Sequence, residues 1–163
     1  MQVQHKITPC LWFDFNAEQA VDFYTSVFPE SRIHEVMRYG EANGPALDGK
    51  ALMISFELAG LPLQALNAGP QFPFTEAISL SVLCEDQDEV DRLWQGLSEG
   101  GSEGQCGWLK DRFGLSWQIV PRRMLELLAD PDRDRAGRAM QAMMTMGKID
   151  IGVIERSAEG AEV

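Results

Sequence analysis

The sequence has few of the residues that usually hold transition metals. Of 163 residues, two are histidines (His5 and His34) and three are cysteines, and no two cysteines have CxxC spacing. A structural zinc site needs four such ligands, and a disulfide framework needs paired cysteines in an oxidising compartment. We therefore expect reduced thiols and no metal site built from histidine and cysteine within one chain.

Basic residues are also scarce, because 14 Lys and Arg stand against 25 Asp and Glu, a formal net charge of -11. Such a surface repels phosphate backbones and anionic membranes. No apolar run approaches the roughly 20 residues of a membrane span, and the start, MQVQHKITPC, lacks the apolar core of a signal peptide. We expect no nucleic-acid partner, no membrane association and a cytoplasmic location.

The residues that are present favour a globular chain, with 45% hydrophobic and 24% charged residues. Strands are predicted at 7–13, 31–39, 51–58 and 61–67, and a helix follows the first of them. Asn16 and Gln19 predict a capping box at the start of this helix, and Pro29 ends it. Its apolar stripe comprises Ala17, Ala20, Val21 and Tyr24.

The same order of elements then recurs. A strand is predicted at 77–84, a helix follows with Asp86 and Glu89 as its capping box, and strands follow near 101–106, 108–111 and 116–120. The buried stripe of this helix comprises Val90, Leu93, Trp94 and Leu97. We therefore predict an α+β domain over 1–120, built of paired β-α-β-β-β units at 1–68 and 76–120.

Residues 121–163 form a predicted C-terminal helical extension. PRRMLELLA indicates a short helix, and a longer helix follows with Asp130 as cap, Pro131 in the first turn and Gly147 at its end. Its apolar stripe comprises Ala136, Ala139, Met140, Met143 and Met144. We favour packing of this stripe on the body or on a dimer partner; a partner-binding surface is the alternative.

Four segments carry a resemblance to a known family: AVDFYTSVF, LNAGPQFPFTEAISLSV, CGWLKDRFGLSWQIVP and AMMTMGKIDIGVIE. They resemble the PhnB-like branch of the vicinal oxygen chelate (glyoxalase/bleomycin resistance/dioxygenase) superfamily, whose members often carry the label 3-demethylubiquinone-9 3-methyltransferase. The resemblance implies that paired units form a cleft, with a metal on the inner faces of four strands, and that a homodimer is common. The chain has no Gly-rich Rossmann turn that could hold S-adenosylmethionine, so whether it is an enzyme stays open.

The resemblance places Thr8, Gln64, Ala77 and Gln118 at the four metal positions, with Gln118 where a glutamate is usual. None of these side chains carries the charge or imidazole that a divalent cation needs. We therefore expect neither a metal nor another cofactor. This assignment assumes that alternate strand residues face the helices, namely Leu11, Phe13, Ile78, Leu80, Val82, Trp117 and Ile119.

The expected cleft instead presents neutral hydrogen-bonding groups beside aromatic rings, which suits a small, partly apolar organic ligand. Its predicted lining comprises Thr8, Cys10, Trp12, Gln64, Ser79, Ser81, Trp108 and Gln118. The alternative for Gln64 and Gln118 is that they bond each other or buried backbone, and for Trp12 that it only packs.

Cys106 is a candidate nucleophile, because Lys110 nearby in sequence would favour its thiolate. No histidine lies near it in sequence, so a structural thiol is the alternative. Asp111, Arg112 and Gly114 are expected to build the turn before the last strand, with Arg112 paired to an acid.

Three functions are consistent with these features. The first is a metal-independent protein that binds a small organic molecule, with or without a reaction. The second is a metal-dependent lyase, isomerase or dioxygenase of the same superfamily. The third is an interaction module that acts through the Met-rich C-terminal helix.

Overall fold

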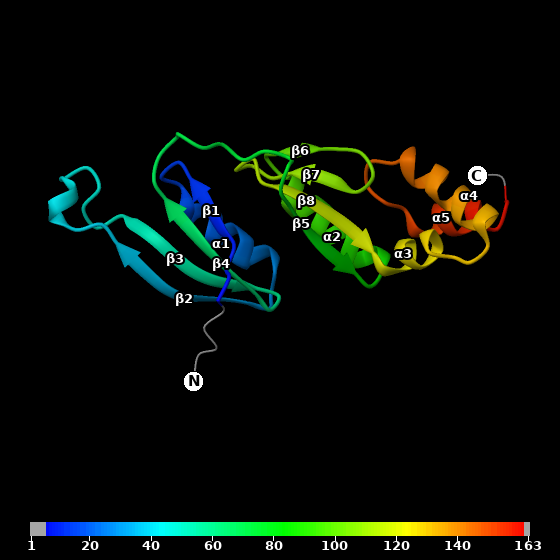
Figure 1. The fold of residues 1–163 in the computed structure, drawn as a ribbon, viewed down its shortest axis with the longest axis horizontal. Helices are drawn as coiled ribbons and strands as arrows, with labels where there is room; N and C mark the ends of the chain where they lie inside the picture. Colours follow the sequence, from blue (N-terminus) through cyan, green and yellow to red (C-terminus); the bar gives the residue numbers. More distant parts are fainter. Residues whose placement is uncertain (1–5, 162–163) are drawn as a thin grey trace. The chain divides into compact units, whose positions relative to one another are not determined.

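The computed structural model describes residues 6–161, so His5 lies outside the described part (Figure 1). The chain divides into two compact units, Met1–Pro73 and Phe74–Val163. No helix between residues 6 and 161 has the length and apolar character that a bilayer span requires.

The first unit has the predicted β-α-β-β-β order, with a short 3-10 helix, η1 (Glu41–Asn43), in the loop between its second and third strands. Its sheet has the order β1-β4-β3-β2, with β1 parallel to β4 and the other pairs antiparallel. The first strand begins at Cys10, three residues later than predicted. The elements are β1 (Cys10–Phe13), α1 (Ala17–Val27), β2 (Ser31–Arg38), β3 (Ala51–Leu58) and β4 (Leu61–Asn67).

Helix α1 packs against one face of this sheet through the predicted stripe of Ala17, Ala20, Val21 and Tyr24, all of which are buried. The predicted capping box is wrong, because the Asn16 side chain makes no capping hydrogen bond. The Ala17 N–H instead donates to Oδ1 of Asn67 at 3.1 Å, and Nδ2 of Asn67 donates to the Ala51 carbonyl at 3.0 Å. A tertiary contact therefore replaces the local cap.

The second unit repeats this topology, with the sheet order β5-β8-β7-β6 and β5 parallel to β8. Helix α2 buries its predicted stripe, and Oδ1 of Asp86 accepts the Glu89 N–H at 2.9 Å. The Glu89 carboxylate accepts the Glu85 N–H at 2.8 Å. The elements are β5 (Ser79–Cys84), α2 (Gln87–Ser98), β6 (Ser102–Glu103), β7 (Trp108–Lys110) and β8 (Ser116–Pro121).

The prediction that Ile78 faces the core is wrong, because its side chain is 71% exposed. A turn precedes β5, in which the Ile78 N–H donates to the Thr75 carbonyl. The strand therefore begins at Ser79, and Leu80 and Val82 pair with the buried Trp117 and Ile119.

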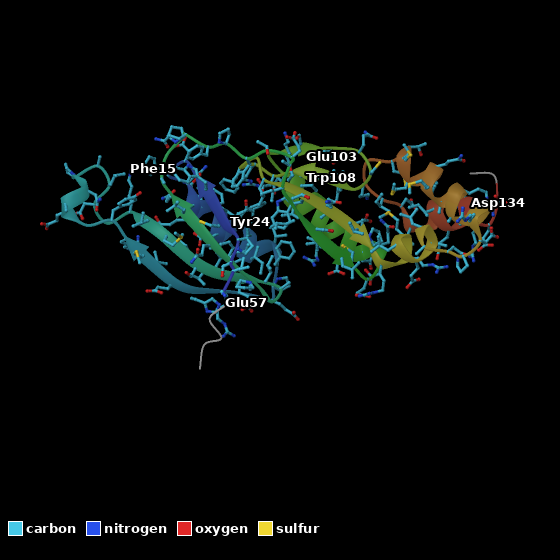
Figure 2. The ribbon with its side chains drawn as sticks, viewed as in Figure 1. Phe15, Tyr24, Glu57, Glu103, Trp108 and Asp134 are labelled. Carbon is cyan, nitrogen blue, oxygen red and sulfur yellow. The ribbon has the colours of Figure 1, made fainter. Side chains whose placement is uncertain are left out.

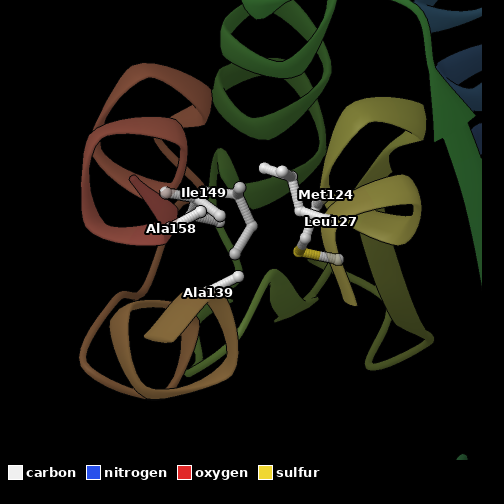
Figure 3. Packing of buried hydrophobic residues seen from close by; sticks show 6 residues of the cluster. Met124, Leu127, Ala139, Ile149 and Ala158 are labelled. Atoms are coloured by element: carbon white, nitrogen blue, oxygen red, sulfur yellow. The ribbon is translucent and has the colours of Figure 1, made fainter. Parts of the chain in front are cut away.

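The C-terminal extension comprises α3 (Arg122–Leu128), α4 (Arg133–Met144) and α5 (Ile151–Ala158), of which α5 was not predicted. The three helices enclose a small core, shown in Figure 3. It contains Met124, Leu127, Ala139, Ile149, Ile154 and Ala158. The cap of α4 is Asp132 and not Asp130, since Oδ1 of Asp132 accepts the N–H groups of Asp134 and Arg135.

The predicted apolar stripe of α4 divides between the core and the surface. Ala139 is fully buried and Met143 packs partly against the core, whereas Met140 and Met144 are 42% and 64% exposed. The core of the extension is small, so it buries fewer residues of α4 than the predicted apolar stripe contains.

The extension is attached to the rest of the second unit by polar contacts. The Gln87 side chain donates to the Ile149 carbonyl at 3.0 Å and accepts the Ile151 N–H at 2.9 Å. Lys148 pairs with Asp91 at 2.7 Å. The N–H of Cys106 donates to the Met146 carbonyl at 2.8 Å. The segment around KIDI therefore connects the extension to α2 and to the turn after β6.

Candidate ligand-binding faces

Each sheet has one face covered by its helix and one open face. In the first unit, Leu11 and Phe13 are 6% and 2% exposed beneath α1, as expected, and Cys10 and Trp12 lie on the opposite face. Cys10 pairs with Gln64 on β4, and Gln64 pairs with Ser55 on β3. Cys10 and Gln64 of the predicted lining therefore share one row, while Thr8 lies before the start of β1.

The open face of the first unit also carries two carboxylates that sequence reasoning missed. Glu35 pairs with Ser55. Glu57, which is labelled in Figure 2, lies one alternate position beyond Ser55 on β3. Nε2 of His34 lies 3.7 Å from Oε2 of Glu57. The apolar alternation in MISFEL already placed Glu57 on this face, but a register shift in β2 between Ile33 and Glu35 hid the contact with His34.

The side chain of Trp12 makes its contacts within the first unit. Its indole Nε1–H donates to the Gly69 carbonyl at 2.7 Å, and its ring meets Phe72 edge to face with centroids 4.9 Å apart. Phe72 is 64% exposed and Phe15 is 41% exposed. These residues leave aromatic surface accessible at this end of β1, while the indole N–H is already bonded.

The open face of the second unit carries mostly uncharged side chains. One row joins Ser102, Lys110, Ser116 and Ser79, and the next joins Trp108, Gln118 and Ser81. Nε2 of Gln118 donates to Oγ of Ser79 at 2.9 Å, so an internal partner holds this glutamine. The structure thus brings Ser79, Ser81, Trp108 and Gln118 of the predicted lining onto one face.

Two side chains in this face stand out. Ser116 is 1% exposed, and its hydroxyl has no hydrogen-bond partner among the described residues. Lys110, opposite Ser116 on β7, pairs with the carboxylate of Glu76 from the turn before β5. The hydrogen bond from Lys110 lowers the pKa of Glu76.

The KDRFGLSW segment builds the frame of this face. Asp111 is 3% exposed, and its Oδ1 accepts the N–H groups of Phe113 and Leu115 at 2.8 and 3.1 Å. Its Oδ2 accepts the indole N–H of Trp117 at 2.8 Å. Arg112 pairs with Glu99, as expected, and Gly114 has a φ of 88° in the turn. Asp111 therefore joins the turn to the buried side of β8.

The cysteines differ in their surroundings. Burial raises the pKa of the Cys84 thiol to about 12 and also raises the pKa of Cys10, so both thiols are protonated at neutral pH. Cys106 lies in the turn after β6, where its backbone contacts the extension, while the Lys110 ammonium pairs with Glu76. These contacts favour the structural interpretation of Cys106, and its role as a nucleophile stays a prediction.

The four positions that the resemblance gave to a metal do not fit a divalent cation. Ala77 lies in the turn before β5, and Gln118 is engaged with Ser79. Thr8 and Gln64 offer neutral oxygens only. Among residues 6–161, no group of three His, Cys, Asp or Glu side chains is arranged to hold a metal ion.

Comparison with known proteins shows which family the chain belongs to. A sequence model of the family described as 3-demethylubiquinone-9 3-methyltransferase matches residues 5–120. The PhnB protein from Bacillus cereus is 36% identical, with 72% of this chain and 99% of that chain covered and a TM-score of 0.66. Protein PA1353 from Pseudomonas aeruginosa is 24% identical, with 72% and 98% covered and a TM-score of 0.59.

A more distant structure shares the fold alone. The fosfomycin resistance protein FosX from Listeria monocytogenes is 13% identical, with 79% of this chain and 100% of that chain covered and a TM-score of 0.54. No curated protein matches the chain. The fold is that of the vicinal oxygen chelate, or glyoxalase, proteins, as expected. The chain belongs to the PhnB-like 3-demethylubiquinone-9 3-methyltransferase family, and residues 121–163 lie outside the family match.

Proposed function

We propose that this protein binds a small organic molecule on the open faces of its sheets, without the divalent metal of its superfamily. The observation that carries the proposal is the open face of the second unit, where Gln118, Ser79 and Ser81 offer neutral hydrogen-bonding groups beside Trp108. Ligand sites combine a few oriented polar groups with aromatic surface in this way. The proposal assigns no reaction, and methyl transfer is not part of it.

A thermal-shift screen of small organic metabolites against metal-free protein tests this proposal. A ligand at about 100 times its Kd stabilises the folded protein by about 2.7 kcal/mol, which gives a clear rise in Tm. Gln118→Ala should weaken the binding of any hit about tenfold, since it removes an oriented amide. The control is Gln141→Ala, at an exposed glutamine on α4. Equal binding by the two variants would contradict the proposed site.

Metal content separates this proposal from the metal-dependent alternative. Protein purified without chelator should contain no stoichiometric Zn, Mn, Ni or Fe, because the donor set at the four positions is neutral. One tightly held metal ion per chain, lost together with an enzymatic activity on chelation, would favour a metal-dependent lyase, isomerase or dioxygenase.

We also propose a homodimer. Strand β2 lies at the edge of its sheet and exposes apolar side chains, with Ile33 43%, Val36 37% and Met37 55% exposed. Exposed apolar surface on a sheet edge favours association with another chain. Light scattering should give about twice the 18.2 kDa of one chain. Met37→Glu should lower this mass; if Met144→Glu on α4 lowers it instead, the Met-rich helix is the interface.

A further inference from the structure

Lys110 is the single charged side chain that the described strands of the second unit place on their open face. The other side chains of this face are those of Ser79, Ser81, Leu83, Ser102, Trp108, Ser116 and Gln118, and at its end that of Val120, which packs against the core of the extension. Residues 1–120 contain 17 acids and 7 bases, so a cation here is not one of many on a basic surface. Its position opposite a row of hydroxyls suggests a specific use.

Serine hydroxyls share the row of Lys110 on the sheet. Ser116 lies directly opposite Lys110 on β8, and Ser79 lies opposite Ser116 on β5. The Ser116 hydroxyl is buried and has no partner among the described residues, although buried hydroxyls are usually bonded. A hydroxyl donor (Ser116) and an ammonium group (Lys110) on neighbouring strands can together bind an anionic group.

Glu76 already supplies such an anionic group. Its carboxylate pairs with Lys110 from outside the strands, and its side chain is 62% exposed. Exposed ion pairs stabilise weakly and exchange readily, so another carboxylate or a phosphoryl group can take the place of Glu76.

We propose that Lys110 and Ser116 form the head-group site for a small organic anion, which binds by replacing the carboxylate of Glu76. This inference rests on the proposed function and adds the chemical class of its ligand. Lys110 supplies the charge and the Ser116 hydroxyl donates to the head group. Gln118, Ser81 and Trp108, in the next row of the sheet, contact the organic body. Carboxylate and phosphoryl groups share the required chemistry.

Titrations of the full-length protein with benzoate, its neutral analogue benzamide and inorganic phosphate test this site. Binding is followed by calorimetry and by the NMR shifts of the Ser116 and Gln118 amides. Benzoate or phosphate should bind, and benzamide should bind at least about tenfold more weakly than benzoate, since it lacks the charge. The stronger of the two anions identifies the head group.

Matched variants separate the site from general charge effects. Lys110→Gln should weaken anion binding about tenfold, and Ser116→Ala about threefold. Glu76→Gln should tighten it about threefold, because the competing carboxylate is gone. The controls are Lys148→Gln and Asp91→Asn, which break an ion pair of similar exposure elsewhere in the same unit and should leave binding unchanged.

The outcomes distinguish this inference from the proposed function. Equal binding of benzoate and benzamide, or equal effects of Lys110→Gln and Lys148→Gln, would overturn the anion site and leave small-molecule binding intact. Absence of binding by both anions, even to the Glu76→Gln variant, would overturn it as well. Failure of the metabolite screen together with absence of benzoate binding would overturn both proposals, whereas a screen hit whose binding is unchanged by Lys110→Gln would overturn the anion site only.

Discussion

The two units of this chain share one topology but present different chemistry on their open faces. Each places one helix against a four-stranded sheet with the same strand order. The open face of the first unit carries Glu35, Glu57 and His34. That of the second carries serines, Gln118 and one lysine. The faces covered by the helices are apolar in both units, so the two units differ chiefly in the chemistry of their open faces.

The units also differ in what stabilises them. A buried amide, Asn67, joins β4 to the start of α1 in the first unit. A buried carboxylate, Asp111, joins the turn before β8 to Trp117 in the second. The second unit in addition carries the extension with its own small core.

The largest effect is expected from Asp111→Ala. The change leaves two backbone N–H groups and one indole N–H without their acceptor, which should lower the free energy of unfolding by about 3 kcal/mol. Urea unfolding followed by tryptophan fluorescence measures this, since three of the four tryptophans lie in the second unit. The control is Asp48→Ala, at an exposed loop position. A loss below about 1 kcal/mol would contradict the role given to Asp111.

In the first unit, Asn67→Ala should cost about 2 kcal/mol, because it removes the acceptor of the Ala17 N–H and the donor to the Ala51 carbonyl. Asn16→Ala is the matched control at the position where the sequence predicted a cap. Its side chain makes no capping bond, so the change should alter the free energy of unfolding by less than about 0.5 kcal/mol. A larger loss of stability from Asn16→Ala than from Asn67→Ala would contradict this account and support the predicted capping box.

The attachment of the extension is tested by Gln87→Ala. Loss of its two hydrogen bonds to Ile149 and Ile151 should cost about 1 kcal/mol and increase hydrogen exchange in α5. Gln95→Ala, at an exposed position of the same helix, should change neither quantity. Unchanged exchange in α5 would show that the extension is held by other contacts.

The smallest effect concerns acid sensitivity. Glu85 has a pKa lowered from 4.5 by its hydrogen bonds with Arg122. A carboxyl whose folded pKa is lowered contributes stability above its unfolded pKa and loses it as pH falls through the folded pKa. Glu85→Gln should therefore be less stable than the parent protein at neutral pH, and the difference should shrink as the pH falls through the lowered pKa of Glu85. Chemical unfolding at several pH values measures this; a constant difference would contradict it.

Sequence patterns predicted the fold well because they report burial. The stripes of α1 and α2 and the alternation of Leu11 and Phe13 were read correctly, since each follows the period of its element. Features that depend on distant contacts were missed. Asn67 caps α1 from 50 residues away, and the turn at 75–78 delays β5 so that Ile78 is exposed. Helix α5 is short and depends on the core of the extension.

The candidate site was predicted less completely. Alternation along the strands placed Gln118 and Trp108 on the open face, but only the structure pairs Gln118 with Ser79 and Lys110 with Glu76. The sequence did not predict the contact between His34 and Glu57, because this contact depends on a register shift in β2.

Native mass spectrometry of the purified protein tests the central claim most directly. Metal-free chains incubated with a hit from the metabolite screen should gain the mass of one organic molecule, and Gln118→Ala should lose most of this adduct. A tightly bound stoichiometric metal ion, required before any organic molecule binds, would contradict a metal-independent ligand site.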